Sequence, residues 1–271
     1  MLLSINRCTN PIKIKNTIFR WFIAVKNYEM KLSKNHTKLI ASLQQKKYRQ
    51  KHQLFLAEGV KVVRELLASS LEVAQIFATT AFETAVPAAQ LVVVSEAELK
   101  KISQLKTPNK VVGIFKIPQE KTPVTTGLCV ALDGINDPGN LGTIIRLCDW
   151  FGVSQLLCST ETVDCYNAKV VQASMGSLTR VAVNYVALPT FLETITTPVY
   201  AADMHGENIY QTTLPKEAIL VLGNEANGIS KEMKNLISNT IAIPRFGDVQ
   251  ETESLNVATA GAILLSEFRR G

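Results

Sequence analysis

Three polar segments of this 271-residue chain follow strand-like apolar runs, and each contains a side chain that could take part in chemistry. In chain order they are Asp133–Gly142 with Arg146 in the helix that follows, Gly223–Gly228 with Glu225, and the segment that leads to Ser254-Leu255-Asn256. Ligands usually bind at the carboxyl ends of strands in an α/β sheet. The sequence therefore favours a site for a polar ligand at this edge of the sheet. Such a ligand would meet a guanidinium, a carboxylate, a hydroxyl and the free N–H groups of helix starts.

Each segment also has an ordinary structural interpretation. Gly223–Gly228 has the composition of a plain turn, since Gly and Asn adopt the left-handed conformation readily. Arg146 could be a paired structural charge, and Ser254 is well suited to cap a core helix. The Asp133–Gly142 segment has neither the G-x-G-x-x-G nor the G-x-x-x-x-G-K-[ST] spacing, which argues against a dinucleotide site or a P-loop.

Apolar strand-like runs alternate with helical patterns in the second half of the chain. The predicted strands are 128–132, 155–158, 180–186, 199–202, 218–222 and 240–243, and the predicted helices are 142–151, 167–178, one from 230, and the C-terminal helix. Continuously apolar strands separated by helices indicate a parallel sheet covered on both faces. The terminal helix has no polar face before Ser266, so we expect it to be buried on nearly all sides.

The first half predicts a smaller α/β module. Residues 31–50 have a helical pattern with many bases, and a second helix follows Gly59. Strand-like runs at 73–78, 91–94 and 111–117, with a helix at 95–105, complete it. Residues 117–127 contain two prolines and no periodicity, so we expect domains at 30–116 and 128–271 joined by this linker.

The net charge of +6 is distributed unevenly along the chain. Residues 1–52 carry 12 Lys and Arg against the single acid Glu29, whereas residues 121–271 carry 10 bases and 15 acids. A basic N-terminal part beside an acidic body is typical of a module that holds a polyanion, although a solvated tail has the same composition.

Residues 1–29 contain five bases and no acid before Glu29. They could be a transit-like peptide, a basic arm that contacts RNA, or the product of an upstream misassigned start. We favour the last, with Met30 as the true first residue, because a regular helical pattern begins only after it.

The five cysteines are odd in number and form no C-x-x-C pair, which predicts buried thiols in a reducing, cytoplasmic compartment and no structural zinc. No apolar run approaches the ~20 residues that a membrane span requires.

Taken in order, NDPGNLGTIIRLCDWFGV, LVLGNEANGIS and IPRFGDVQETESLNVATAGAILLSEF resemble the three motifs of the SpoU-type (TrmH-like) RNA ribose 2′-O-methyltransferases of the SPOUT superclass. The resemblance is close over residues 128–271, and residues 31–116 look like the small, ribosomal-protein-like RNA-binding domain of that family. It implies a parallel α/β sheet with a C-terminal trefoil knot, S-adenosylmethionine as cofactor, RNA as substrate with ribosomal RNA favoured over transfer RNA, and a homodimer.

The resemblance also implies roles for individual positions. The residues that match the family's catalytic positions are Asn140, Arg146, Glu225, Ser254 and Asn256. Those that match its cofactor-binding positions are Leu222, Gly223, Asn224, Ile243 and Leu255, and no metal is implied. In the family the arginine is thought to act at the cofactor site of the neighbouring protomer.

Arginine is a poor base because its pKa lies above ~12. We therefore expect Arg146 to clamp the target phosphate and to lower the pKa of the ribose hydroxyl, with Ser254 or Glu225 helping to position it. Two departures from the family pattern affect the third motif. Its loop, residues 246–253, is long and acidic, and Arg245 stands where an apolar residue is frequent. No histidine falls in a motif, which argues against a histidine base.

Two other functions remain open from the residues. One is a non-catalytic RNA-binding or assembly factor that has kept the fold. The other is a nicotinamide-dependent α/β enzyme, which the missing glycine fingerprint disfavours.

Overall fold

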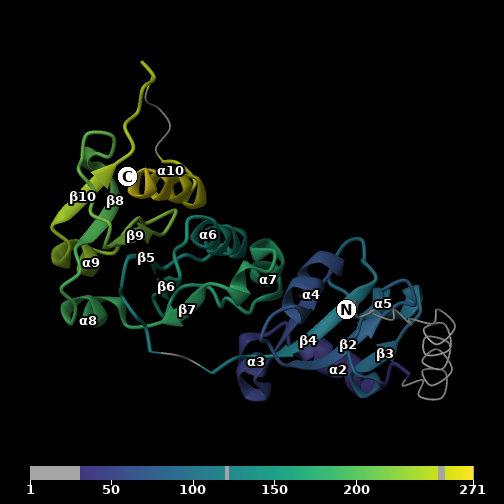
Figure 1. Cartoon of the computed structure of the whole chain (residues 1–271). Coiled ribbons are helices and arrows are strands. Elements are labelled where there is room, and N and C mark those ends of the chain that lie inside the picture. The colour runs from purple at the N-terminus through teal and green to yellow at the C-terminus, as the bar shows by residue number, and fades with distance from the viewer. Residues whose placement is uncertain (1–30, 120–121, 250–253, 271) are drawn as a thin grey trace, which may run out of the picture.

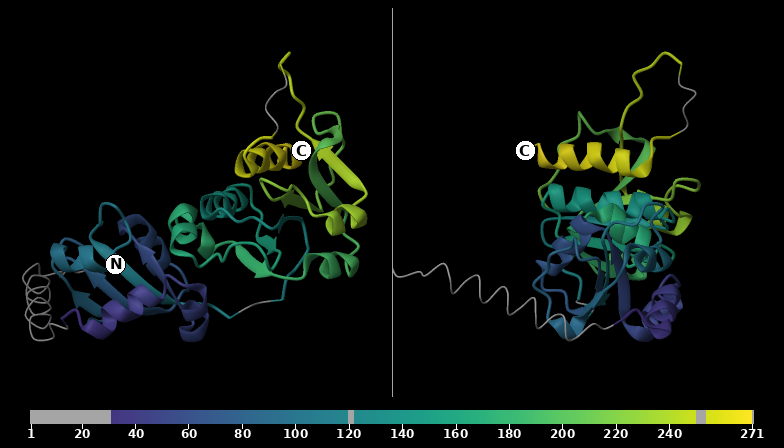
Figure 2. Two further views of the ribbon diagram at one scale, coloured as in Figure 1. Left: turned by 180° about the vertical axis from the view of Figure 1, so that it is seen from behind. Right: turned by 90° about the vertical axis from the view of Figure 1, so that its right-hand side faces the viewer.

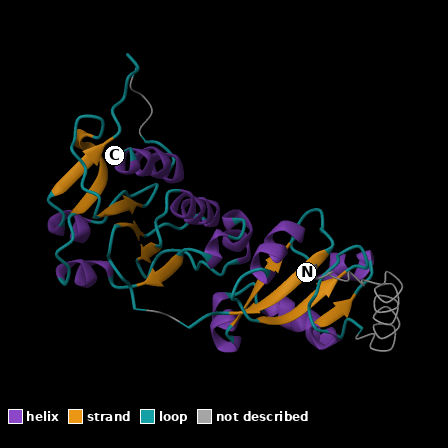
Figure 3. Cartoon of the chain, in the orientation of Figure 1, coloured by secondary structure: helices purple, strands orange, loops and turns teal. Residues whose placement is uncertain are grey.

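The computed structural model describes residues 31–119, 122–249 and 254–270, and Figure 1 shows them as two α/β units. The predicted features of residues 1–29 lie outside the described residues. The N-terminal unit (residues 31–116) and the C-terminal unit (residues 127–270) each contain a sheet covered by helices on both faces (Figures 1 and 3).

The N-terminal unit is built on a four-stranded mixed sheet with the order β1-β4-β2-β3. Its strands are β1 (Leu54–Glu58), β2 (Val73–Ala78), β3 (Leu91–Val93) and β4 (Val111–Lys116), and its helices are α2 (Lys34–Ser42), α3 (Lys46–His52), α4 (Val60–Leu67), η1 (Ala88–Gln90) and α5 (Glu96–Ile102). β4 pairs antiparallel with β1 and β2, whereas β3 runs parallel to β2. Alternate strand residues enter different cores: Phe55 and Phe115 pack with α4, and Leu56 and Ile114 pack opposite them with Ile40 of α2.

Two predictions for this unit are wrong in detail. The helix predicted over residues 31–50 is two helices, because α2 ends at Ser42 and α3 begins at Lys46. The carbonyls of Leu43 and Gln44, which continuation of α2 would have used, accept hydrogen bonds from Arg49 instead. Strand β1 was not predicted, since the run before Gly59 was taken only as the approach to α4.

The C-terminal unit contains six parallel strands in the order β10-β8-β9-β5-β6-β7. The strands are β5 (Leu128–Asp133), β6 (Gln155–Cys158), β7 (Ala182–Tyr185), β8 (Val199–Asn208), β9 (Ala218–Gly223) and β10 (Asn239–Ala242). The helices are α6 (Pro138–Trp150), α7 (Ala168–Ser174), η2 (Ser177–Thr179), α8 (Leu188–Glu193), α9 (Lys231–Leu236) and α10 (Val257–Arg269). This confirms the parallel α/β sheet predicted from the sequence.

The helices of this unit divide between the two faces of the sheet. Buried side chains of α6, α7 and α10 pack with Val130, Leu132 and Leu220 on one face. Those of α8 and α9 pack with Ala131 and Val221 on the other. Helix α10 lies along α6, and the N-terminal unit lies beyond α7 (Figures 1 and 2). The strand order does not by itself establish a threaded chain, so the trefoil knot stays a prediction.

Helix starts were the least accurate predictions in this unit. Helix α6 begins at Pro138, four residues before the predicted Gly142, because Asp137 caps it and accepts a hydrogen bond from the Asn140 N–H at 2.8 Å. Helix α10 is capped by Asn256, so the predicted capping by Ser254 is wrong.

Burial of α10 is also less complete than predicted. Val257, Gly261 and Leu264 are buried, but Ala262 and Ile263 are only half-buried in the single chain. Helix α8 was not predicted, and β8 is longer than the predicted 199–202.

Candidate active site

A cavity of about 730 Å³ opens where β9 and β10 end and α10 begins. Three parts of its wall are the carboxyl end of β9 with the turn that follows, the end of β10 with the segment after it, and the start of α10 with Ser254 and Leu255. The described part of the segment between β10 and α10 extends away from the body of the unit (Figure 2). The cavity therefore lies at the edge of the sheet where the sequence predicted a site.

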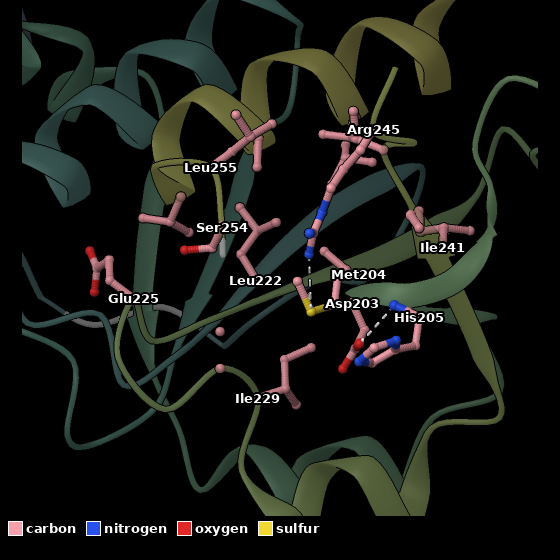
Figure 4. Close-up of a pocket in the computed structure, with 18 of the residues that line it drawn as sticks. Asp203, Met204, His205, Leu222, Glu225, Ile229, Ile241, Arg245, Ser254 and Leu255 are labelled. Carbon is pink, nitrogen blue, oxygen red and sulfur yellow. Dashed lines mark hydrogen bonds between the residues drawn. The ribbon is translucent and has the colours of Figure 1, made fainter. Parts of the chain in front are cut away.

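A break in the pairing of β8 supplies the fourth part of the wall. Thr240 of β10 pairs with Ala201, but the next residue, Ile241, pairs with Glu207, so residues 202–206 leave the ladder. Asp203 and His205 of this bulge line the cavity. They lie across it from Glu225 and Ser254 (Figure 4).

The turn after β9 is held by its own residues. A Cβ on Gly223 would collide with the backbone of Gly228 and Ile229, so only glycine fits where the chain folds back. The Asn224 side chain accepts hydrogen bonds from the N–H groups of Ala226 and Asn227 at 2.9 and 3.1 Å. Its Nδ2 donates to the Gly134 carbonyl at 2.6 Å, which ties this turn to the loop after β5.

A chain of hydrogen bonds joins the three segments that the sequence singled out. Asn140 Nδ2 donates to Glu225 Oε1 at 2.5 Å, and Asn140 Oδ1 accepts from Asn256 Nδ2 at 2.9 Å. Asn256 Oδ1 in turn accepts from the N–H groups of Ala258 and Thr259 at the start of α10. Because both ends of the Asn140 amide are used, its orientation is fixed, and it holds Glu225 at the rim of the cavity.

The rest of the wall is largely apolar, but it includes the partly exposed ion pair of Asp203 and Lys234. Leu222, Ile243 and Leu255 line it, and Leu255 is 48% exposed although it is a large apolar side chain. Asp203 accepts a hydrogen bond from Lys234 Nζ at 2.7 Å, and this bond holds the pKa of the Asp203 carboxyl below its ordinary value. Asp203 is therefore ionised at neutral pH.

The predicted site residues fall into three groups. Seven of them line the cavity: Leu222, Gly223, Asn224, Glu225, Ile243, Ser254 and Leu255. Asn140 and Asn256 do not line the cavity, but they belong to the hydrogen-bond chain that holds Glu225. Arg146 is exposed on α6 and does not belong to the described lining of this cavity, so a single chain does not bring it to the others.

Sequence reasoning missed the bulge of β8. Asp203, His205 and Lys234 line the cavity but lie outside all three motifs. That no histidine acts as the base stays a prediction. The predicted strand stopped at Ala202, and an apolar run carries no signal for a bulge of this kind. Arg245, noted as a departure from the family pattern, also lines the cavity, and its Nη2 lies 3.8 Å from the sulfur of Met204.

Comparison with known proteins gives a consistent result over both units. The profile of the SpoU rRNA Methylase family matches residues 127–266, and that of the MRM3-like substrate binding domain matches residues 34–113. The chain belongs to the SpoU rRNA methylase family. The matched segment contains every residue of the cavity wall, together with Asn140 and Arg146.

Individual relatives resemble the chain over most of its length. The 23S rRNA (guanosine(2553)-2′-O)-methyltransferase of Bacillus subtilis is 30% identical over 84% of this chain and 93% of its own length. A TrmH-family protein from Porphyromonas gingivalis is 40% identical, with a TM-score of 0.80 over 88% of this chain and 98% of its own. An AdoMet-bound rRNA methyltransferase from Sinorhizobium meliloti is 29% identical, with a TM-score of 0.76 over 88% and 95% of the two chains.

Within the described ranges, His, Cys, Asp and Glu side chains form no cluster that could hold a metal ion. The same part of the chain contains no helix long and apolar enough to cross a membrane.

Proposed function

We propose that this protein transfers a methyl group from S-adenosylmethionine to a ribose 2′-hydroxyl in structured RNA, with ribosomal RNA favoured over transfer RNA. The observation that carries the proposal is the hydrogen-bond chain from Glu225 through Asn140 to Asn256, which assembles the three family motifs beside one cavity. The names of the relatives, which specify ribosomal RNA and its 2′-oxygens, support the substrate class.

The cavity suits S-adenosylmethionine in size and chemistry. Its volume lies within the range of small-molecule sites, and apolar walls with a few polar groups are typical of them. Leu222, Ile243 and Leu255 would contact the adenosine, with backbone groups of Gly223 and Asn224 beside them. Asp203 and Glu225 would offset the positive charges of the cofactor.

When bound, S-adenosylmethionine supplies an electrophilic methyl group. We propose that Arg146 binds the phosphate next to the target ribose and eases loss of the 2′-hydroxyl proton to solvent, while Ser254 or Glu225 orients that hydroxyl. The ribose oxygen would gain the methyl group, and S-adenosylhomocysteine would leave. The planar guanidinium can donate two parallel hydrogen bonds to a phosphate, which lysine cannot do.

The position of Arg146 supports a site shared between two protomers. Arg146 lies one turn before Trp150 on the exposed side of α6. Trp150 is 84% exposed in the single chain, and large aromatic side chains are enriched at protein interfaces. Helix α10, which packs beside α6, has the half-buried Ala262 and Ile263. We propose a homodimer through these helices, in which Arg146 reaches the cavity of the partner.

Incorporation of labelled methyl groups tests the function. The protein, labelled S-adenosylmethionine and unmodified large-subunit ribosomal RNA should give labelled 2′-O-methyl nucleotides. A protein that binds the cofactor but labels neither ribosomal nor transfer RNA would instead be a non-catalytic RNA-binding factor. Thermal stabilisation by NAD, without any by S-adenosylhomocysteine, would favour the nicotinamide enzyme.

A mixing experiment tests the shared site. Arg146→Ala and Gly223→Ala should each be inactive alone. Co-expressed, they should recover about one quarter of the activity, because half of the randomly formed dimers contain one intact pair of Arg146 and cavity. If Arg146 acted in its own chain, no dimer would have an intact site and no activity would return.

The four described cysteines are free thiols, which fits the cytoplasmic location predicted from the sequence. The trefoil knot and the domain boundaries after residues 29, 116 and 127 remain part of this proposal.

A further inference from the structure

The boundary between the two units contains a buried ion pair that the cavity does not use. Arg49 of α3 and Asp164, in the turn before α7, have side chains that are only 3% and 13% exposed. Arg49 Nε and Nη2 lie 2.8 and 2.6 Å from Asp164 Oδ2. The two residues belong to different family domains and are 115 positions apart in the chain.

Every nitrogen of the Arg49 guanidinium has a partner. Its Nη1 donates to the carbonyls of Leu43 and Gln44, both at 2.9 Å, and these are the carbonyls left open where α2 ends. One side chain thus joins the end of α2, helix α3 and the C-terminal unit. A lysine could not do so, because a single ammonium cannot present donors in three fixed directions in one plane.

The C-terminal side of this pair is equally constrained. Asp164 Oδ1 accepts a hydrogen bond from the Tyr166 N–H at 2.9 Å. The Tyr185 hydroxyl of β7 donates to the Val163 carbonyl at 2.6 Å and accepts from the Cys165 N–H at 2.7 Å. The turn that carries Asp164 is therefore fixed to the parallel sheet that also carries the cavity.

Side chains of the two units also pack together at this boundary. The rings of Phe55 and Tyr166 lie 4.9 Å apart between centroids, and Val171 of α7 belongs to the core of the N-terminal unit. Gly176 has a φ of +96°, and a Cβ there would lie 2.5 Å from the Cβ of Glu65 in α4. The boundary thus has an apolar core with a buried charge pair, which distinguishes it from a loose contact between domains.

Helix α3 also bears exposed positive charge. Lys46, Lys47 and Lys51 are exposed on it, and no acid occurs between residues 31 and 57. Such a surface attracts phosphates without fixing where they lie. The direction in which α3 presents an RNA to the cavities therefore depends on how α3 is attached to the C-terminal unit.

We propose that the Arg49–Asp164 pair fixes the orientation of the RNA-binding unit, so that Arg49 is a positioning residue for the RNA substrate. The inference rests on the proposed function. Without the pair the N-terminal unit would sample several orientations. The apparent affinity for RNA would then fall in proportion to the fraction of molecules whose orientation allows RNA to bind. Binding of S-adenosylmethionine would not change, because residues of the C-terminal unit alone form the cavity. It lies beside β8, β9 and β10, whereas Asp164 follows β6 near the other edge of the sheet.

The test is a double-mutant cycle on the full-length protein with Arg49→Met, Asp164→Asn and the double variant. Either single change leaves one buried charge without its counter-ion and should lower the melting temperature. The double variant removes both charges and should recover the part of the loss that the unpaired charge causes, while the carbonyls of Leu43 and Gln44 still lack the Arg49 donors. If the role is positioning, all three variants, including the stable double, should show an RNA KM raised roughly tenfold at unchanged kcat and cofactor affinity. The RNA used is an unmodified transcript of large-subunit ribosomal RNA.

Arg180→Met is the matched control. Arg180 also bridges the units, donating to Glu65 and Asp149, but its side chain is 49% exposed. Exposed pairs contribute little, so the KM of this variant should change less than about twofold. The proposal is overturned if the double variant has both the melting temperature and the RNA KM of the unaltered protein. It is also overturned if the RNA KM of the three variants rises only in proportion to their loss of melting temperature.

Small-angle X-ray scattering without RNA separates this proposal from the proposed function. The double variant should have a larger radius of gyration than the unaltered protein. An identical scattering profile would show that the Arg49–Asp164 pair does not fix the orientation of the unit. If the unaltered protein methylates no RNA, the proposed function fails, and the scattering result still tests the orientation of the unit.

Discussion

Two polar networks cross between distant parts of this chain, and they differ in their exposure to water. At the cavity, Asn140 is half-buried and hydrogen-bonds to the exposed side chains of Glu225 and Asn256. At the boundary of the units, Arg49 and Asp164 form an ion pair whose side chains are only 3% and 13% exposed. An exposed network can exchange its partners for a ligand at small cost, whereas a buried charge pair cannot lose one member without leaving the other unpaired. The first is suited to chemistry and the second to fixed geometry.

The largest expected effect is on stability at the boundary. Arg49→Met should lower the free energy of unfolding by about 3 kcal/mol, because the Asp164 carboxylate is left buried without its cation. Urea unfolding measures it. Lys116→Met, which removes the exposed ion pair with Glu72, is the control and should cost less than about 0.5 kcal/mol. Equal losses would remove the distinction between the two kinds of network.

Arg146 should show the opposite behaviour, with a large effect on rate and little on stability. Arg146→Ala should lower kcat roughly 100-fold, the loss typical of one stabilising donor in an active site. The free energy of unfolding should change by less than about 0.5 kcal/mol, because the side chain is exposed. Arg146→Lys separates a two-pronged clamp from a simple positive charge, since near-full turnover by that variant would exclude the clamp.

Asn140→Ala should have a smaller effect on rate. It removes the link between Glu225 and Asn256, so kcat should fall about tenfold through loss of positioning. Asn256 still caps α10, and the melting temperature should therefore change little. Asn140→Asp is the companion variant, and because it places a carboxylate against Glu225, it should be at least as impaired as the alanine variant. Full activity of both would show that the chain is dispensable.

The smallest effect concerns the Asp203–Lys234 pair in the cavity wall. The hydrogen bond from Lys234 lowers the pKa of Asp203 in the folded state. The pair therefore stabilises the fold fully at pH values above the pKa that this carboxyl has in the unfolded chain. That contribution is lost as the pH falls through the pKa of the folded state. Lys234 is half exposed, and solvent screening should keep the difference between the protein and Asp203→Asn below about 1 kcal/mol at neutral pH. Unfolding curves between pH 7 and about pH 2 should show the difference disappearing below the ordinary carboxyl pKa near 3.9. A difference that grew in acid would reverse the sign.

Much of the fold could be predicted because its signals are local. Strands β5, β6 and β9 lie within a residue of the predicted runs, since continuously apolar segments between helices have one common structure, the covered parallel sheet. Elements whose ends depend on distant partners were predicted poorly. Helix α2 stops at Ser42, where Arg49 binds the Leu43 and Gln44 carbonyls that a continued helix would have used. Strand β8 continues past a bulge that forms against β10.

The sequence alone identified the chemistry of this protein. Its three strand-end motifs, their order and their residue types were sufficient to indicate the family, the cofactor and most of the cavity wall, because these depend on residues that lie close together in the chain. Only the tertiary structure decided what depends on contacts between distant segments. It placed Asp203 and His205 in the cavity, directed Arg146 away from it, and buried Arg49 against Asp164. Which side chains become buried, and which distant residues they contact, is decided when separate elements pack together. The spacing of residues along the chain does not predict either.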